Sequence, residues 1–168
     1  MSPRRPPSPD DLTPAAGCRV ALRLLAGREF TTAELRARLL RRGFPPAVAD
    51  DVLRALTEQG AVDDGRAARA RARHEAVIKR HGRSRALRQV QALGVDRDTA
   101  RQAVAAAFED IDESDLLARA LARRLRGAPL PSDPLARRRL EAWLVGQGFE
   151  PAAVRKLISQ ALTGASRC

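Results

Sequence analysis

A helix–glycine–helix unit occurs three times in this chain, and no other feature limits the possible folds as strongly. The first copy, ELRARLLRRGFPPAVADDVLRAL, spans residues 34–56 and breaks at Gly43. The other copies span 86–104 and 140–162 and break at Gly94 and Gly148. The three glycines are 51 and 54 residues apart. A period of about fifty residues is typical of an array of similar structural units.

The apolar residues of the first copy predict two helices joined at the glycine. Leu35 and Leu39 lie one helical turn apart before the break, and Val52 and Leu56 have the same spacing after it. Gly43 suits the left-handed position that ends a helix, because it has no Cβ atom to clash with the backbone.

Alignment on the glycines brings apolar pairs into register. Val52-Leu53, Ala103-Val104 and Leu157-Ile158 fall at the same two offsets. A single helical unit cannot cover its own apolar face, so neighbouring units must stack. No segment shows the period-two alternation of a strand. The sequence therefore predicts an all-α fold with three tandem three-helix repeats that form an elongated, curved array.

The domain organisation follows from these units. We expect a disordered leader over 1–14, helical repeats over 15–62, 63–110 and 111–163, and a frayed tail over 164–168. In the middle repeat the first helix should run from Asp64 to about Arg80. Thr31 and Glu34 have capping-box spacing. The expected caps of later helices are Asp63 with Asp64, Asp96, and either Ser132 or Asp133.

Positive charge is spread along the whole chain. The net charge is +11, and each repeat contributes a balance of +3 or +4. Such a balance indicates nucleic acid or an acidic protein surface as the partner. Coding bias explains why arginine outnumbers lysine, but it does not explain why acidic residues are fewer.

The basic residues form two clusters that are candidates for partner binding. Arg66, Arg69 and Arg73 have the spacing of one stripe on a helix, and Arg119, Arg123 and Arg126 form a second stripe. The full set of candidates is Arg66, Arg69, Arg73, Lys79, Arg80, Arg83, Arg85, Arg88, Arg119, Arg123, Arg124, Arg126, Arg137 and Arg138. Any single arginine of this set is most simply interpreted as part of a solvated helix face. Clustered like charges destabilise a helix unless a partner compensates them, which favours a binding role.

Aromatic residues do not alternate with this charge. Trp143, Phe44 and Phe149 fall at apolar offsets of the helix pairs, so we expect them in the core. A platform that stacks single-stranded bases is therefore not predicted. Charge without stacking indicates contacts to phosphates or carboxylates.

Other classes of site have little support. The sequence has no glycine-rich phosphate loop and no group of Ser, His and Asp that could form a catalytic site. His74 and His81 are interpreted as helix residues. We therefore expect no enzymatic activity and no cofactor. Cys18 and Cys168 belong to no metal-binding pattern, so we expect reduced thiols, no metal and a cytoplasmic location. No apolar run reaches the length of a membrane span.

At these repeats the chain resembles RecX, the family of regulators of the RecA recombinase. The shared motifs are ELRARLLRRGF at 34–44, the Val62-Asp63-Asp64 step, the Gly82…Leu87…Gly94-Val95 run, and RRLEAWLVGQGF at 138–149. The resemblance covers about residues 15–162, and it rests on the order and spacing of three related units. The chain departs from the family at Ala67-Ala68, where an aromatic residue is usual, and at Val95, where the outer repeats have Phe. We therefore expect weaker packing in the middle repeat.

The resemblance implies a function. Members of the family lodge in the helical groove of the RecA–DNA filament, contact more than one recombinase subunit, and restrain ATP turnover, strand exchange and filament growth. It thus implies a role in the control of homologous recombination, DNA repair and the SOS response. The implied partners are the RecA filament and, weakly and without sequence preference, single- or double-stranded DNA. We expect the protein to be a monomer that does not bind membranes.

Two other functions stay open on the residues alone. The first is a basic helical DNA-binding module, such as a helix-turn-helix, without a recombinase partner. The helix pair within 35–56 has suitable spacing, but Asp50 and Asp51 on its second helix are unfavourable in a major groove. The second is a helical scaffold or RNA-associated protein.

Overall fold

A computed structural model describes residues 12–165 of the chain, so most of the expected leader and the last three residues lie outside the described part. The described residues form nine α-helices and one π-helical segment, η2, and contain no strand. The elements are α1 (Pro14–Leu25), α2 (Thr32–Arg41), α3 (Pro46–Glu58), α4 (Asp64–Arg73), η2 (His74–Ile78), α5 (Arg83–Gln91), α6 (Arg97–Ala107), α7 (Glu113–Leu125), α8 (Pro134–Gly146) and α9 (Pro151–Ala165).

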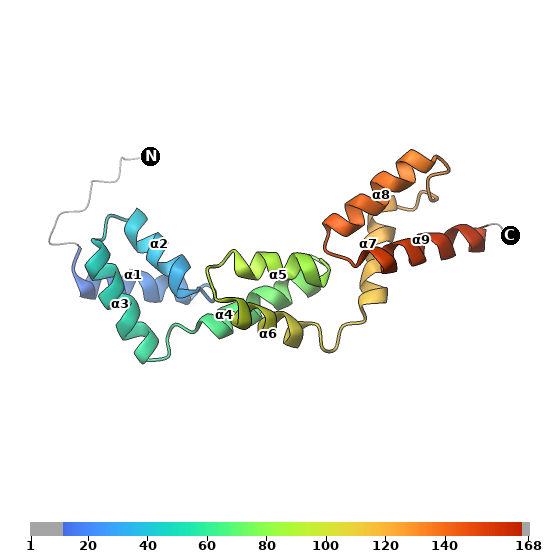
Figure 1. Ribbon diagram of the computed structural model, residues 1–168. Helices are drawn as coiled ribbons and strands as arrows, with labels where there is room; N and C mark the ends of the chain where they lie inside the picture. Colours follow the sequence, from blue (N-terminus) through green and yellow to red (C-terminus); the bar gives the residue numbers. More distant parts are fainter. Residues whose placement is uncertain (1–11, 166–168) are drawn as a thin grey trace.

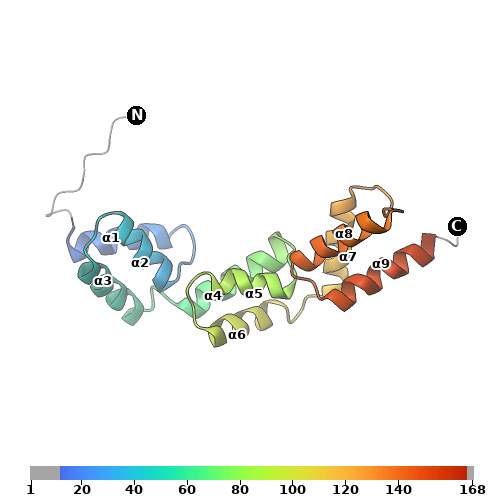
Figure 2. The ribbon, with the colours of Figure 1, turned by 45° about the horizontal axis from the view of Figure 1, so that its top comes forward.

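The helices follow one another in groups of three along an elongated, curved array (Figure 1). The group α1–α3 lies at one end, α4–α6 in the middle and α7–α9 at the other end, and a turned view shows the same order (Figure 2). This confirms the all-α fold of three tandem three-helix repeats.

The caps that set the helix boundaries are those expected from the sequence. Thr31 Oγ1 accepts a hydrogen bond from the Glu34 N–H at 3.2 Å, and the Glu34 carboxylate accepts one from the Thr31 N–H at 3.1 Å. Asp63, Asp96 and Asp133 each accept backbone N–H donors at the start of a helix. The glycines at the three breaks all have positive φ, 89° at Gly43, 82° at Gly94 and 98° at Gly148.

Three boundaries differ from the expectation. The helix α1 starts at Pro14 and is capped by Thr13, so the end of the expected leader is helical. The helix α9 continues to Ala165, into the expected tail, while residues 166–168 lie outside the described part.

The third difference is the end of α4. It gives way at His74 to the π-helical segment η2, where the Lys79 N–H donates to the His74 carbonyl five residues back. Arg80 then takes a left-handed conformation with φ of 57°, so the expected continuous helix to Arg80 is wrong. Within η2, Glu75 turns inward: it is only 2 % exposed and pairs with the partly exposed Arg71 and with His81.

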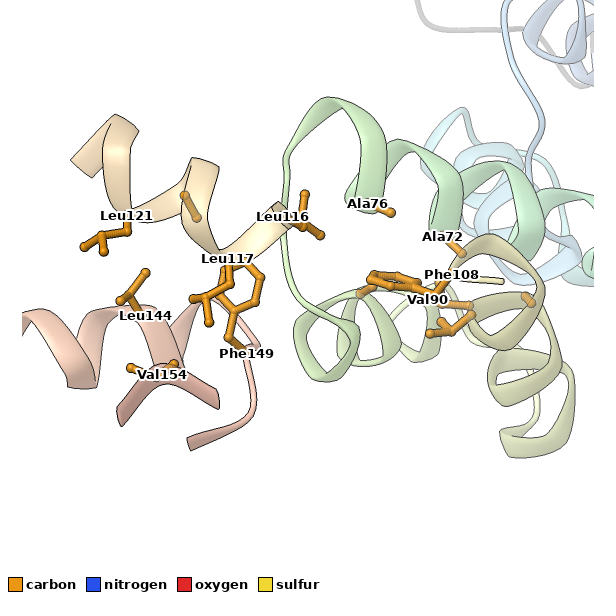
Figure 3. Packing of buried hydrophobic residues seen from close by; sticks show 14 of the residues in the cluster. Ala72, Ala76, Val90, Phe108, Leu116, Leu117, Leu121, Leu144, Phe149 and Val154 are labelled. Carbon is orange, nitrogen blue, oxygen red and sulfur yellow. The ribbon is translucent and has the colours of Figure 1, made fainter. Parts of the chain in front are cut away.

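The apolar residues form two cores. One belongs to α1–α3 and includes Phe30, Phe44 and Leu56. The other is continuous through α4–α9. Figure 3 shows this second core as two packed groups, one around Phe108 in the middle repeat and one around Leu144 in the third, with Leu116 between them.

The middle repeat is packed by small side chains. Ala67, Ala68 and Ala72 of α4 are buried, as are Ala100 and Ala103 of α6. Alanine lets two helices approach closely, so α4 does not need an aromatic residue near its start. The ring of Phe108, which is 2 % exposed, closes this core at the end of α6 instead. The expected weaker packing at Ala67-Ala68 stays a prediction.

The repeats meet through the same kind of contact at both junctions. A Cβ atom added at Gly94, after α5, would lie 2.7 Å from the Cβ of Ala33 at the start of α2. A Cβ atom added at Gly148, after α8, would lie 2.7 Å from the carbonyl oxygen of Gly82, just before α5. The end of the middle helix of one repeat thus rests against the beginning of the middle helix of the preceding repeat.

Candidate partner-binding surface

The expected stripe on α4 exists, but its three arginines are not equivalent. Arg66 Nε lies 2.8 Å from Glu29 Oε1, and its guanidinium also donates to the Ala61 carbonyl at 3.1 Å. The hydrogen bond that Arg66 donates to Glu29 raises the pKa of Arg66 above its ordinary value. Arg69 and Arg73 are exposed and have no ion pair with any described residue. Arg66 therefore fixes the chain before α4, and two arginines remain available to a partner.

A groove runs beside this stripe, between α4 and α6. It has a volume of about 420 Å³. Arg66, Arg69 and Arg73 line one side, Ala103, Ala106 and Ala107 line the other, and Glu29 stands near Arg66 at one end. The arginines were predicted from the sequence, but the alanines were not. Their spacing in RDTARQAVAAA was a signal for a flat helix face, but it did not show that α6 lies beside α4.

Arg71 points away from this groove and belongs to a buried charge group. Its Nε lies 3.0 Å from Glu75 Oε1, a charge contact without the alignment of a hydrogen bond. Glu75 Oε2 lies 2.6 Å from His81 Nδ1. Burial lowers the pKa of His81, aided by the positive charges of Arg85 and Arg123, and outweighs the opposite effect of Glu75. Neutral His81 can donate its Nδ1–H to the carboxylate, so this group ties the turn that precedes α5 to η2.

A second basic region forms where η2 meets α7. The Arg123 guanidinium donates to the Lys79 carbonyl at 3.4 Å, and Arg80 and Arg119 line one hollow with three aspartates. Arg119 also pairs with Asp115 at 2.8 Å. The structure thus joins parts of two clusters that are separate in the sequence. Val77 and Ile78 of η2 are exposed beside them, which the expected continuous helix did not indicate.

Several candidate residues connect elements instead of facing an open surface. Arg83 pairs with Glu113 at 2.9 Å, and its guanidinium carbon lies 5.1 Å from the centre of the Phe108 ring. Arg85 donates to the Gln147 side chain at 3.2 Å, across the junction of the second and third repeats. We therefore assign Arg83 and Arg85 mainly to the structure, whereas Arg88 is exposed and has no ion pair with any described residue.

The remaining candidates lie on α7 and α8. Arg124 places its guanidinium carbon 5.4 Å from the centre of the Trp143 ring. Trp143 packs against the core as expected, but its side chain is only partly buried. Phe44 and Phe149 are buried, as expected. Arg126 ends α7 in a left-handed conformation, φ 52°. Arg137 and Arg138 lie in the first turns of α8, and neither has an ion pair with another described residue.

The helix pair α2–α3 does not offer a recognition helix. Asp50 on α3 pairs with Arg36 at 2.7 Å, and this hydrogen bond lowers the pKa of Asp50. Asp51 pairs with Arg54 at 2.6 Å. The outer side of α3 is therefore acidic and internally paired, which does not suit a DNA major groove.

Other kinds of site find no support in the part of the chain that the structure describes. Within residues 12–165 no group of three or more His, Cys, Asp or Glu side chains is placed to hold a metal ion. No helix in the same range is long and apolar enough to cross a membrane. Cys18 is a free thiol, and Cys168 lies outside the described residues.

Comparisons with known proteins agree on one family. Residues 19–56 match the family model described as RecX, first three-helix domain. A protein named Regulatory protein RecX from Halorhodospira halophila is 39 % identical over 80 % of this chain and 81 % of its own length. One of the same name from Treponema pallidum (strain Nichols) is 31 % identical over 87 % of this chain and 85 % of its own. The crystal structure of RecX from Lactobacillus salivarius has a TM-score of 0.69 at 18 % identity, covering 90 % of this chain and 97 % of that one.

Proposed function

The chain belongs to the RecX family of regulatory proteins, and we propose that it regulates a RecA recombinase by binding along the RecA–DNA filament. The observation that supports this most is the match over 80 % of the chain to a protein named as a RecX regulator. The action we propose is inhibitory: the bound protein restrains ATP turnover, strand exchange and filament growth. It acts by binding and carries out no chemistry of its own.

The shape and charge of the array support this proposal. An elongated array (Figure 1) can follow a helical groove and contact several recombinase subunits in succession. Arginines without an ion pair to a described residue occur in all three repeats, among them Arg19 and Arg23 on α1, Arg69 and Arg73 on α4, Arg88 on α5 and Arg138 on α8. Charges spread in this way suit an extended anionic surface more than a single small ligand.

The region where η2 meets α7 is a candidate for phosphate contacts only on its arginine side. Arg80 and Arg119 line a hollow there, Arg123 donates to the Lys79 carbonyl, and the described lining residues include no aromatic ring to stack a base. Asp110, Asp112 and Asp115 line the same hollow, so the hollow itself would repel phosphate. We propose that this region lies near the DNA of the filament. Binding to free DNA should then be weak, independent of sequence and strongly reduced by salt.

A retention experiment tests the function. Biotin-tagged single-stranded DNA is immobilised bare or coated with a bacterial RecA and a slowly hydrolysed ATP analogue, at about 0.15 M salt so that exposed charges are screened. We expect the protein to be retained far better by the coated DNA. Equal retention on bare and coated DNA would instead support a DNA-binding module without a recombinase partner. No retention on either DNA would favour the remaining alternative, a helical scaffold or RNA-associated protein.

A further inference from the structure

We propose that the groove between α4 and α6 is a docking site for an acidic, partly apolar segment of a protein partner. Arg69 and Arg73 bind its carboxylates, and the alanines of α6 receive its apolar side chains. The partner's identity as the recombinase rests on the proposed function, but the chemistry of the groove does not. The groove is lined by Glu29, Arg66, Arg69, Ala70 and Arg73 on one side and by Ala103, Ala106 and Ala107 of α6 on the other.

Arg69 and Arg73 can bind a partner, whereas the neighbouring Arg66 and Arg71 are already held by carboxylates. Arg66 is held by Glu29 at 2.8 Å, and Arg71 by Glu75 at 3.0 Å. Within residues 12–165, Arg69 and Arg73 have no ion pair, although they lie one helical turn apart on the same side of α4. Two unpaired guanidinium groups at this spacing can each bind a carboxylate in a bidentate manner.

The floor of the groove is apolar and hollow because its residues are alanines. Ala103 is buried against α4, Ala106 is exposed and Ala107 is partly buried. The hollow of about 420 Å³ is open to solvent and not enclosed, which suits an extended segment lying along it more than a small enclosed ligand. Methyl groups bounded by charged side chains reproduce the pattern of a protein interface, with an apolar centre and a polar rim.

Glu29 argues against nucleic acid as the occupant. Its carboxylate stands at one end of the groove, 2.8 Å from Arg66, so that end is close to neutral. A nucleic-acid backbone carries charge at every nucleotide and would bring a phosphate near Glu29. A peptide can place carboxylates at Arg69 and Arg73 and a neutral side chain at Glu29. No aromatic residue lines the groove to stack a base.

Two variants of the groove separate charge from shape. Arg69→Glu with Arg73→Glu reverses the charge, and Arg19→Glu with Arg23→Glu is its matched control, because those exposed arginines of α1 have the same spacing and lie outside the groove. Ala106→Trp fills the floor without changing charge, and Ala105→Trp on the exposed, neighbouring position is its control. Circular dichroism and thermal melting first verify that each variant is folded.

The measured quantities are affinity for RecA-coated DNA and affinity for the same DNA without recombinase. We expect each groove variant to bind coated DNA about tenfold more weakly or worse, while the controls stay within about twofold of the wild type. Binding of Ala106→Trp to bare DNA should not change. A competing synthetic peptide that carries Asp, Glu and Leu should displace the wild type from coated DNA better than a neutral peptide does.

Three outcomes would overturn the inference or its premise, and they are distinguishable. If the wild type binds coated DNA but both groove variants match their controls, the groove is not the docking site. If Ala106→Trp loses bare-DNA affinity as strongly as coated-DNA affinity, the groove receives phosphate and not a peptide. If the wild type shows no preference for coated DNA, the proposed function fails first, and direct binding of the acidic peptide to the wild type but not to Arg69→Glu with Arg73→Glu then decides on the groove alone.

Discussion

Gly82 and Gly148 touch through their backbones, with the Gly82 N–H donating to the carbonyl of the neighbouring Gln147 at 2.9 Å. Neither glycine has room for a Cβ atom: one on Gly148 would lie 2.7 Å from the Gly82 carbonyl oxygen, and one on Gly82 would clash with the Gly148 backbone. This contact joins the second and third repeats. The position of α7–α9 relative to α4–α6 therefore depends on two residues that have no side chain.

Gly82→Ala should destabilise the protein by about 1–3 kcal/mol, the usual result of adding a methyl group to a closed contact. Gly82 has φ of −72°, so the effect would come from the clash and not from backbone strain. Gly146→Ala is the matched control, because a Cβ atom there would meet nothing within 4 Å. Chemical denaturation measures both, and equal stability of the two variants would mean that the junction can open without cost.

Gly43→Val should cost about 1 kcal/mol or more, because a β-branched residue does not readily take a left-handed conformation. Gly43 has φ of 89°, the conformation expected from its place between two helices. Gly27→Val is a control at a glycine without positive φ. A thermal melt of Gly43→Val that matches the wild type would contradict the capping role of this glycine.

Leu144→Ala should cost about 2–5 kcal/mol, because Leu144 is fully buried in the core of the third repeat. Trp143→Ala should cost less, about 1–2 kcal/mol, since the ring is only partly buried and loses less apolar contact. Because Trp143 is only partly buried, replacing it should reduce the free energy of unfolding less than replacing a fully buried core residue does. Denaturation curves that rank Trp143→Ala above Leu144→Ala would show that the ring is buried more deeply than the structure has it.

Acidification should weaken the fold through His81. Because burial lowers the pKa of His81 below its ordinary value of about 6.5, the unfolded chain binds this proton more readily than the folded chain does. Stability should then decrease as the pH falls below about 6.5. The groups facing this ring are the carboxylate of Glu75 and the guanidinium groups of Arg85 and Arg123.

His81→Gln should remove this part of the pH dependence, because glutamine can donate to Glu75 without binding a proton. His74→Gln, at an exposed position of the same segment, is the control. Asp96 and Glu150, whose pKa values are lowered by backbone and side-chain donors, lose their contribution only at lower pH and do not disturb the test. A wild-type melting temperature that is constant between pH 7.5 and 5.5 would refute the role of His81.

The fold could be predicted from the sequence because its signals are local. The glycine breaks at Gly43, Gly94 and Gly148 and the caps at Thr31 and Asp96 depend on neighbours within a few residues. The π-helical segment was not predictable in this way. It depends on Glu75 turning inward to meet His81, and a spacing of helical residues alone does not show which side chain will be buried.

The candidate surface could be predicted only as a set of charges. The sequence places Arg66, Arg69 and Arg73 on one side of a helix, but it does not show that Glu29 of the preceding repeat holds Arg66. It gives no sign that alanines of α6 form the opposite wall of a groove. Both facts depend on packing between helices far apart in the chain. A count of arginines therefore overstates the number that are available to a partner.

Arg119→Gln with Arg123→Gln should weaken binding to bare DNA and reduce its salt dependence. If these residues contact phosphates, the slope of log Kd against log salt should fall by roughly one for each lost contact. Glutamine is chosen because glutamate at 119 would repel Asp115, which now pairs with the arginine at 2.8 Å. Arg19→Gln with Arg23→Gln is the control, and an unchanged slope in the first variant would place the DNA contacts elsewhere.

The central claim is that this protein restrains a RecA recombinase, and the rate of ATP hydrolysis by RecA on single-stranded DNA tests it most directly. The DNA is coated with recombinase before the protein is titrated in, so that competition for bare DNA does not imitate inhibition. We predict that hydrolysis falls steadily as the wild-type protein is added, and that Arg69→Glu with Arg73→Glu needs a higher concentration for the same effect. Hydrolysis that stays constant, at protein concentrations shown to saturate bare DNA, would contradict the account.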